Sequence, residues 1–203
     1  HDFITSNDHS RAVAEVDMYV LEKVCRFLHE RPSVRENVYG VSMKISMMKF
    51  LSQNFEACVD EILKKYGIDP QRIYFKLSET TFSSLPEDGI KKMQQLEGKG
   101  YHFLIDDVGI GFSDMYHLIN AQAVSVNLNS SLIRVASESV RAGAMVKDLV
   151  KMIHDSHQRI GAEGVDTAWQ AEILKTLDCD FAQGDHYSRP LREDRLMTFL
   201  QEH

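Results

Sequence analysis

The sequence has no uninterrupted apolar run of the roughly 18 residues that a membrane-spanning helix needs, which excludes such a helix. It has no basic segment followed by an apolar stretch near its start, so we expect no signal peptide. The first residue is His rather than Met, so we expect the native start to lie upstream. Only four prolines occur and no Pro-, Gly- or Ser-rich linker divides the chain, so residues 1–203 are predicted to form a single domain.

Cysteine and positive charge are also scarce. Cys25, Cys58 and Cys179 lie far apart and are odd in number, which fits neither a disulfide framework nor a CxxC metal site. We interpret them as buried, reduced thiols of a cytosolic domain. The 30 Asp and Glu residues outnumber 23 Lys and Arg, and the net charge of −7 argues against a binder of nucleic-acid polymers. A small anionic ligand held by a few local groups or by metals is compatible with this charge.

Strand-like and helix-like segments alternate regularly along the chain. Six strands that alternate with helices predict parallel βα units, arranged either as a barrel or as a doubly wound sheet. The predicted strands cover residues 40–46, 72–78, 101–106, 123–129, 159–163 and 180–183. The predicted helices cover residues 13–30, 54–66, 86–98, 113–119, 141–156, 168–177 and 191–202.

Each predicted strand carries a polar residue near its C-terminal end, and this favours the barrel. In the strand 72–78, Ile73, Phe75 and Leu77 share one face and Lys76 lies on the other. One charged residue at a strand end is more often a solvated loop anchor than a catalytic group. Six at equivalent places predict a shared C-terminal rim, where barrel enzymes hold their sites. The six residues are Lys44, Lys76, Asp106, Asn127, Glu163 and Gln183.

Four short motifs, found in order along the chain, resemble the signatures of one family. Asp106-Asp107-Val-Gly-Ile-Gly-Phe-Ser is similar to DDFGTGYS, and Ala162-Glu163-Gly-Val-Asp166 is similar to AEGVE. The spacings also fit, with 20 residues from Asp107 to Asn127, 36 from there to Glu163 and 20 more to Gln183. From about Asp2 to Leu191 the chain resembles the EAL domain, the cyclic di-GMP phosphodiesterase family of bacterial signalling. The other two motifs are Asp2-Phe3-Ile4, similar to EFIP, and Ala182-Gln183-Gly184 with Ser188-Arg189-Pro190, similar to QG…SRP.

The resemblance implies a TIM-like (β/α) barrel that linearises cyclic di-GMP with two Mg²⁺ or Mn²⁺ ions. Such hard divalent ions need oxygen ligands. The family supplies them from the Glu of its EAL signature, an Asn on the next strand, an ExxE strand, an Asp pair and the Glu of AEGVE. A Lys beyond the Asp loop orients the attacking water. Of this set the sequence keeps Asp106, Asp107, Glu163 and Gln183, together with Glu79, the second Glu of ExxE.

The departures from the family pattern fall on the metal site. The EAL signature itself does not occur in residues 1–203. Lys44 stands where the family has its metal-binding Asn, and Lys76 where it has the first Glu of ExxE. Asn127 replaces the water-orienting Lys, and Asn129 replaces its Asp partner. Three carboxylates and two lysines carry a net charge of −1, so we interpret Lys44 and Lys76 as substitutes for the positive charge of the metal ions.

These departures predict a degenerate EAL domain, a non-catalytic signalling or regulatory module that dimerises or binds a partner protein and holds no Mg²⁺ or Mn²⁺. Two alternatives stay open: a cyclic di-GMP receptor that binds without hydrolysis, and an active metal-dependent phosphodiesterase. A lysine ammonium is expected within salt-bridge distance of Asp106, Asp107 or Glu163. The domain is expected to be cytoplasmic, as part of a larger signalling protein.

The number of predicted strands bears on assembly. A TIM-like barrel has eight strands, and six are predicted here. The resemblance places the two missing strands before residue 1, so the barrel is predicted to be N-terminally incomplete. Open strand edges invite pairing with another chain, which favours a homodimer.

Two further features are interpreted as structural. Trp169 lies in the first turn of a helix that Thr167 and Gln170 cap, and it is expected to be a packing residue. His154 and His157 share the spacing of one helix face but have no third ligand nearby in sequence. We interpret them as two solvated histidines rather than as a metal pair.

Overall fold

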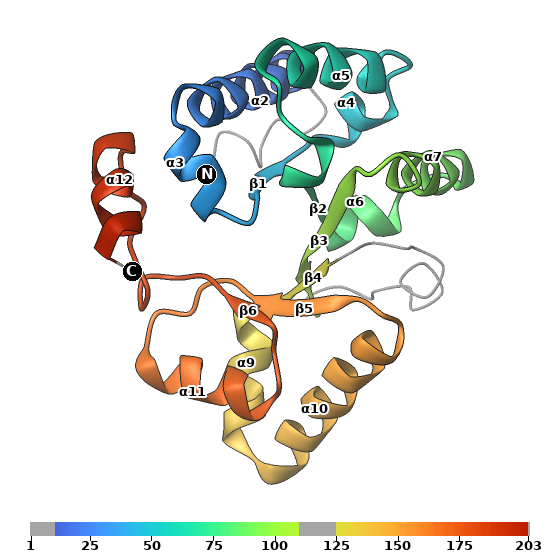
Figure 1. Ribbon diagram of the computed structural model, residues 1–203. Helices are drawn as coiled ribbons and strands as arrows, with labels where there is room; N and C mark the ends of the chain where they lie inside the picture. Colours follow the sequence, from blue (N-terminus) through green and yellow to red (C-terminus); the bar gives the residue numbers. More distant parts are fainter. Residues whose placement is uncertain (1–10, 110–124, 203) are drawn as a thin grey trace. The chain divides into compact units, whose positions relative to one another are not determined.

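The computed structural model describes residues 11–109 and 125–202. The Asp2-Phe3-Ile4 segment, the helix predicted at 113–119 and the first two residues of the strand predicted at 123–129 lie outside these ranges. The strands follow chain order, and the pairs β1–β2, β3–β4, β4–β5 and β5–β6 all run parallel, as predicted. They are β1 (Val41–Lys44), β2 (Ile73–Ser78), β3 (His102–Val108), β4 (Ser125–Leu128), β5 (Arg159–Ala162) and β6 (Phe181–Ala182) (Figure 1).

The chain divides into two compact units, and each carries its own helices. Residues 1–77 and 85–103 belong to the first unit, and residues 78–84 and 104–203 to the second. None of the described helices is both long and apolar enough to cross a membrane. The first unit holds α2 (Arg11–Glu30), α3 (Pro32–Asn37), α4 (Met47–Leu51), α5 (Phe55–Tyr66) and α7 (Glu87–Glu97). The second holds α6 (Glu79–Ser83), α9 (Ser130–Glu138), α10 (Val140–Asp155), α11 (Ala168–Thr176) and α12 (Glu193–Glu202).

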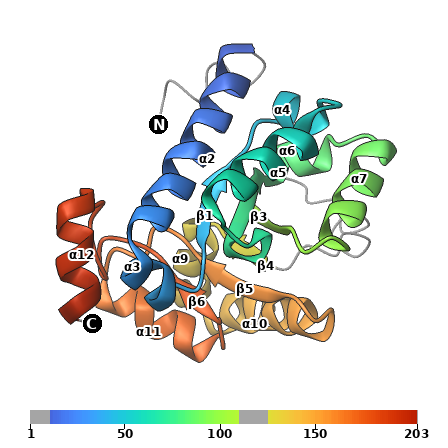
Figure 2. The ribbon, with the colours of Figure 1, turned by 45° about the horizontal axis from the view of Figure 1, so that its top comes forward.

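Four buried phenylalanines form the centre of the first unit. The ring centroids of Phe50 and Phe55 are 5.6 Å apart and those of Phe55 and Phe75 are 5.4 Å apart, in edge-to-face arrangements. Phe103 completes the cluster against Phe50 at 5.6 Å. Such pairs add to the stabilisation from burial because the positive edge of one ring meets the negative face of the next. Helix α2 packs against α5, α4 and β1 around this core (Figure 2).

In the second unit, helices cover a sheet whose strand β4 is buried on both faces. Helix α10 packs on β5 and on α9, and α9 also contacts α11. All four residues of β4 are buried, including the polar Ser125 and Asn127. The sequence of a parallel strand that is covered on both faces is normally a continuous run of apolar residues. The polar residues of β4 therefore need hydrogen-bond partners inside the protein.

Short helices that directly follow a strand were not predicted from the sequence. Ser46, Ser78 and Asn129 each accept a hydrogen bond from a backbone N–H two or three residues further on, and they start α4, α6 and α9. Helices α4 and α6, with five residues each, are too short for an apolar periodicity to be detected. Two smaller expectations also need correction. His154 Nε2 lies 3.0 Å from Asp180 Oδ2 instead of being simply solvated, and only Cys25 of the three free cysteines is fully buried.

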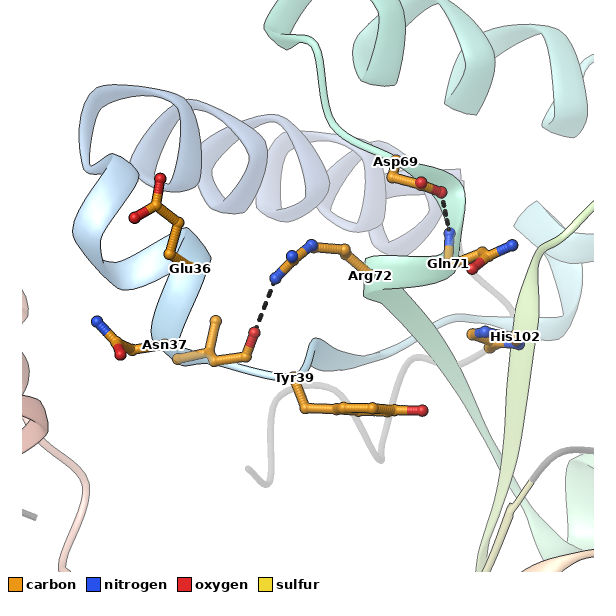
Figure 3. A pocket seen from close by; sticks show the side chains of 8 residues that line it. Glu36, Asn37, Tyr39, Asp69, Gln71, Arg72 and His102 are labelled. Atoms are coloured by element: carbon orange, nitrogen blue, oxygen red, sulfur yellow. Dashed lines mark hydrogen bonds between the residues drawn. The ribbon is translucent and has the colours of Figure 1, made fainter.

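A pocket of about 490 Å³ lies at the N-terminal ends of β1, β2 and β3, and hydrogen bonds within it have a structural role (Figure 3). Arg72 Nη1 donates to the carbonyl oxygen of Val38 at 2.8 Å and also to that of Arg35. These carbonyls belong to the C-terminal end of α3, where a cation is favourable. His102 lines the pocket, and burial lowers the pKa of its imidazole. The guanidinium of Arg72 therefore already connects α3 to the start of β2 through these hydrogen bonds.

Replacement of Arg72 by Leu should destabilise the first unit because it leaves these two half-buried carbonyl oxygens without a donor. We expect a loss of about 1–3 kcal/mol in the free energy of unfolding, measured by urea denaturation. Arg26 is the matched control, since its guanidinium forms an exposed ion pair with Glu30 at 3.9 Å. Arg26→Leu should change stability by less than about 0.5 kcal/mol. Equal effects of the two substitutions would contradict the structural role of Arg72.

Glu97 is a buried carboxyl at the C-terminal end of α7. Both of its oxygens are inaccessible and lack a hydrogen-bond partner among the described residues, and burial raises the pKa of Glu97 to about 7. A negative charge at a helix C-terminus is also unfavourable. Ionisation of Glu97 therefore opposes folding, and the protein should lose stability as the pH rises from about 4.5 to about 7.

Glu97→Gln should remove this decline because the amide cannot ionise. At pH 8 the variant should be more stable than the parent by roughly 1–3 kcal/mol, a value reduced for partial solvation of the site. Urea denaturation at a series of pH values measures the effect. Glu61→Gln, at an exposed position of α5, should leave the decline in place. A parent protein whose stability does not fall across this range would contradict the prediction.

Candidate functional site

Asn127 links two carboxylates that come from the neighbouring strand ends. Its Nδ2 donates to Asp106 Oδ1 at 3.1 Å and to Glu163 Oε1 at 2.9 Å. Asn127 is 2% exposed and Asp106 4% exposed. The three residues come from β3, from β4 and from the end of β5, so the structure brings together three members of the predicted rim.

A bulge in β3 separates the two aspartates of the Asp106-Asp107 pair. The pairing of β3 with β4 shifts between Ile105 and Val108, and Asp107 has a φ of 61°. Aspartate tolerates this left-handed conformation better than most residues. Asp107 Oδ1 accepts a hydrogen bond from Asn129 Nδ2 at 3.1 Å, while Asn129 Oδ1 caps α9 by accepting from the backbone N–H of Ser131. The two aspartates therefore bind two different asparagines.

The ends of β5 and β6 are tied together through the backbone. The N–H of Gln183 donates to the carbonyl of Ala162, and the N–H of Val165 donates to the carbonyl of Gln183. Gly184 allows this approach, because a Cβ there would lie 2.2 Å from the backbone of Val165. The side chain of Gln183 is exposed, so this predicted site residue borders the cluster through its backbone.

Glu79 supports the loop that follows β3. It is the first residue of α6 and 3% exposed, and its Oε2 accepts from the backbone N–H of Gly109 at 3.1 Å. Gly109 has a φ of 105°, a conformation that favours glycine. In this arrangement Glu79 orients the backbone next to Asp106 and Asp107.

Lys44 and Lys76 are register partners at the ends of β1 and β2, in the first unit. Lys76 is 8% exposed and Lys44 is half-buried. A buried ammonium needs a counter-charge or hydrogen-bond acceptors. The expected ion pairs with Asp106, Asp107 or Glu163 stay a prediction.

The donor set does not fit the two-metal site that the family pattern implies. Over residues 11–109 and 125–202, no group of three His, Cys, Asp or Glu side chains has an arrangement that could hold a metal ion. Asp106 Oδ1 and Glu163 Oε1 each accept a hydrogen bond from the amide of Asn127, which occupies one oxygen of each carboxylate. The Oδ1 of Asn127 is buried and has no hydrogen-bond partner in the described part of the chain.

Sequence reasoning missed a pocket of about 440 Å³ beside this cluster. Ser130 and Gly164, which line it, directly follow Asn129 and Glu163 in the chain. Trp169 also lines it and is 54% exposed, so the expectation that it is a packing residue is wrong. The available signal was its position, since Trp169 lies in the first turn of the helix that follows β5, close in sequence to Glu163. The other lining residues are Ser131, Arg134, Asp166, Thr167 and Gln170.

Comparisons with known proteins agree with this architecture. The oxygen sensor protein DosP of Escherichia coli (strain K12) is 24% identical over 198 residues, which cover 98% of this chain and 25% of DosP. The chain thus spans about a quarter of the length of that relative. The structure of the PaMucR phosphodiesterase in complex with c-di-GMP has a TM-score of 0.85 at 22% identity, covering 96% of this chain and 79% of that one. The EAL enzyme Bd1971, in its form bound to cAMP and cyclic di-GMP, has a TM-score of 0.88 at 22% identity, covering 98% and 55%.

These likenesses confirm the predicted fold, a TIM-like barrel of the EAL type with parallel strands. The sequence model of the EAL domain matches residues 1–190, almost the whole chain. The aspartate pair near the end of β3 and the glutamate directly after β5 belong to the motifs on which the resemblance was based. The chain belongs to the EAL domain family of cyclic di-GMP signalling.

Proposed function

We propose that this EAL domain is a non-catalytic signalling module. The observation that carries the proposal is the amide of Asn127, which donates to both Asp106 and Glu163. A hydrolytic site of this family needs carboxylate oxygens free for divalent ions and a cationic group that orients water. Asn127 engages one oxygen of each of the two carboxylates, and its neutral amide does not supply the positive charge of an ammonium to an attacking water.

The charges around the site support the same proposal. Divalent ions would have to bind where the sequence places two lysines, and Lys76 is buried at the end of β2. An ammonium buried with carboxylates neutralises them without any metal. Ion pairing of Lys44 or Lys76 with Asp106, Asp107 or Glu163 is part of this proposal.

The second candidate is a cyclic di-GMP receptor that binds without hydrolysis. The pocket beside the cluster favours it, because its polar lining offers hydroxyl, guanidinium and carboxylate groups to a ligand. The PaMucR structure, a relative in fold, is a c-di-GMP complex, and this supports the choice of nucleotide. Receptor and regulatory functions are compatible, since nucleotide binding can supply the signal that a regulatory domain transmits.

The setting of the domain is proposed from its relatives. Because the chain covers 25% of DosP, we propose that it works within a larger cytoplasmic signalling protein. Strands β1 and β6 stand at the two ends of the strand order, and an unpaired strand edge invites a partner. A homodimer is therefore proposed as the working form.

The unmodified chain should not hydrolyse cyclic di-GMP in Mg²⁺ or Mn²⁺. The measurement is chromatographic detection of the linear dinucleotide, with the PaMucR phosphodiesterase as the positive control. The triple variant Lys44→Asn, Lys76→Glu, Asn127→Lys should stay well below full activity, because the Glu of the EAL signature is not among these 203 residues. Turnover by the unmodified chain of about 1 s⁻¹ or faster, as for an ordinary enzyme, would reject the non-catalytic proposal.

Asn127→Asp should create a site for a divalent ion. The substitution replaces the bridging amide by a third carboxylate between Asp106 and Glu163, so the variant should be destabilised without metal and stabilised by Mn²⁺. At a concentration a hundredfold above Kd, the gain should approach about 2.7 kcal/mol in thermal or urea unfolding.

Asn129→Asp is the matched control for Asn127→Asp. It adds the same charge next to Asp107 alone, and the new carboxylate can still cap α9, so Mn²⁺ should stabilise it much less. The unmodified chain should show no saturable stabilisation by Mn²⁺. If it does, and if Asp106→Asn abolishes the effect, then the amide of Asn127 does not replace the metal.

A further inference from the structure

An exposed tyrosine lies on a fixed segment of backbone just before β1. The side chain of Tyr39 is 77% exposed. On one side of it, the carbonyl of Val38 accepts a hydrogen bond from Arg72 at 2.8 Å. On the other side, Gly40 packs so closely that a Cβ there would lie 2.7 Å from the ring of Tyr74. The exposure of Tyr39 is therefore built into the fold, because both neighbouring residues are held in place.

Tyr39 lines the pocket of about 490 Å³ at the N-terminal ends of β1, β2 and β3, whose lining residues all belong to the first unit. In Figure 3, Arg72 points toward the end of α3 and away from Gln71 and His102. The part of the pocket that Arg72 leaves open is lined by Tyr39, Asp69, Gln71 and His102, and these four residues form the Tyr39 side of the pocket.

The Tyr39 side of the pocket offers hydrogen-bond acceptors and one negative charge. Asp69 Oδ1 accepts from the backbone N–H of Gln71 at 2.9 Å, which leaves the second carboxylate oxygen for a ligand. The exposed side chain of Gln71 adds an amide oxygen. Burial lowers the pKa of His102, so its imidazole is neutral near neutral pH and does not repel a cation. This combination favours a cationic ligand that donates hydrogen bonds.

An aromatic face beside a carboxylate suits a guanidinium better than an ammonium. A guanidinium is planar, stacks on aromatic rings and donates two parallel hydrogen bonds to one carboxylate. Contacts between a cation and an aromatic face involve arginine more often than lysine. The chain itself contains such a contact, since the guanidinium carbon of Arg31 lies 4.6 Å from the ring centroid of Phe27. The net charge of −7 also favours a basic partner.

The pocket is too open to enclose a free small molecule. Small-molecule sites bury about 70–90% of the surface of their ligand. Here most of the lining side chains are themselves exposed, namely Glu36, Asn37, Tyr39, Asp69 and Gln71. A side chain carried on the surface of another protein needs no such enclosure, because the surrounding interface excludes water from it.

We propose that the Tyr39 side of this pocket binds the guanidinium of an arginine side chain of a partner protein. The guanidinium stacks on the ring of Tyr39 and donates to Asp69, and Gln71 accepts a further hydrogen bond. Binding involves no change of covalent bonds. The proposal holds whether or not the domain binds or hydrolyses cyclic di-GMP, because it uses no residue of the candidate site.

N-acetyl-L-arginine amide is the probe, because it presents the side chain without charged backbone groups. Added to the isotope-labelled full chain, it should shift the amide NMR signals of Tyr39, Gly40 and Gln71 saturably, with the millimolar Kd expected for one exposed ionic contact. The uncharged N-acetyl-L-citrulline amide should cause no such shifts. Free L-arginine should bind no more tightly than the probe. If it binds at least about tenfold more tightly, the site takes a small molecule and the assignment to a partner protein is wrong.

Asp69→Asn should weaken binding of the probe by about tenfold, as expected for the loss of a charge-assisted contact. The new side chain can still accept the hydrogen bond from the backbone of Gln71, so the local fold is retained. Asp88→Asn, at an exposed position of α7 outside the pocket, is the matched control and should bind as the parent does. Tyr39→Ala should weaken binding by about threefold, while Tyr39→Phe should keep most of it.

Three results would overturn the proposal. The first is that the folded chain shows no saturable shifts with the probe. The second is that the shifts and the affinity are unchanged in both Asp69→Asn and Tyr39→Ala, so that the guanidinium binds elsewhere. The third is that Asp88→Asn weakens binding as much as Asp69→Asn does. Circular dichroism melting curves verify that each variant is folded. None of these results bears on the non-catalytic proposal, which hydrolysis tests independently.

Discussion

The rim of the second unit depends on the way in which two carboxylates are held next to each other. Asp106 and Glu163 stand at the ends of strands on either side of β4, and like charges in a poorly solvated site repel strongly. Asn127 lies between the two carboxylates and reduces their repulsion, because its one amide nitrogen carries two hydrogens and donates one to each carboxylate. The Asp107–Asn129 pair and the start of α9 are built on the same strand, directly beyond Asn127.

A neutral amide satisfies hydrogen bonds but does not cancel charge. The remaining negative charge has to be balanced, either by cations from the solvent or by ammonium groups of the protein. Under the proposed non-catalytic function, a hydrogen-bonded polar network stands in place of the family's metal site. Such a network can keep the fold of the rim while losing the chemistry that needs metal-bound water.

Much of this architecture could be predicted from the sequence. Alternation with a period of two located all six strands to within two or three residues, and it identified Asn127 and Asp106 as polar residues at strand ends. The short helices α3, α4 and α6 were missed because one or two residues at their starts determine them, without a repeating apolar pattern. Helix α9, with nine residues, was missed although it is amphipathic. Trp169 was misjudged because a capped helix start suggests packing but does not say what covers the ring.

Sequence by itself determined the family, the parallel strand order and the types of residue at the rim, because these follow from local periodicity and from motif spacing. Only the tertiary structure decided that Asn127 faces two carboxylates at once, that Glu79 holds the backbone of Gly109, and that Trp169 borders a pocket. The physical reason is that a strand pattern fixes the face on which a side chain lies. The strand register and the bulge in β3 determine which groups from other segments meet it there.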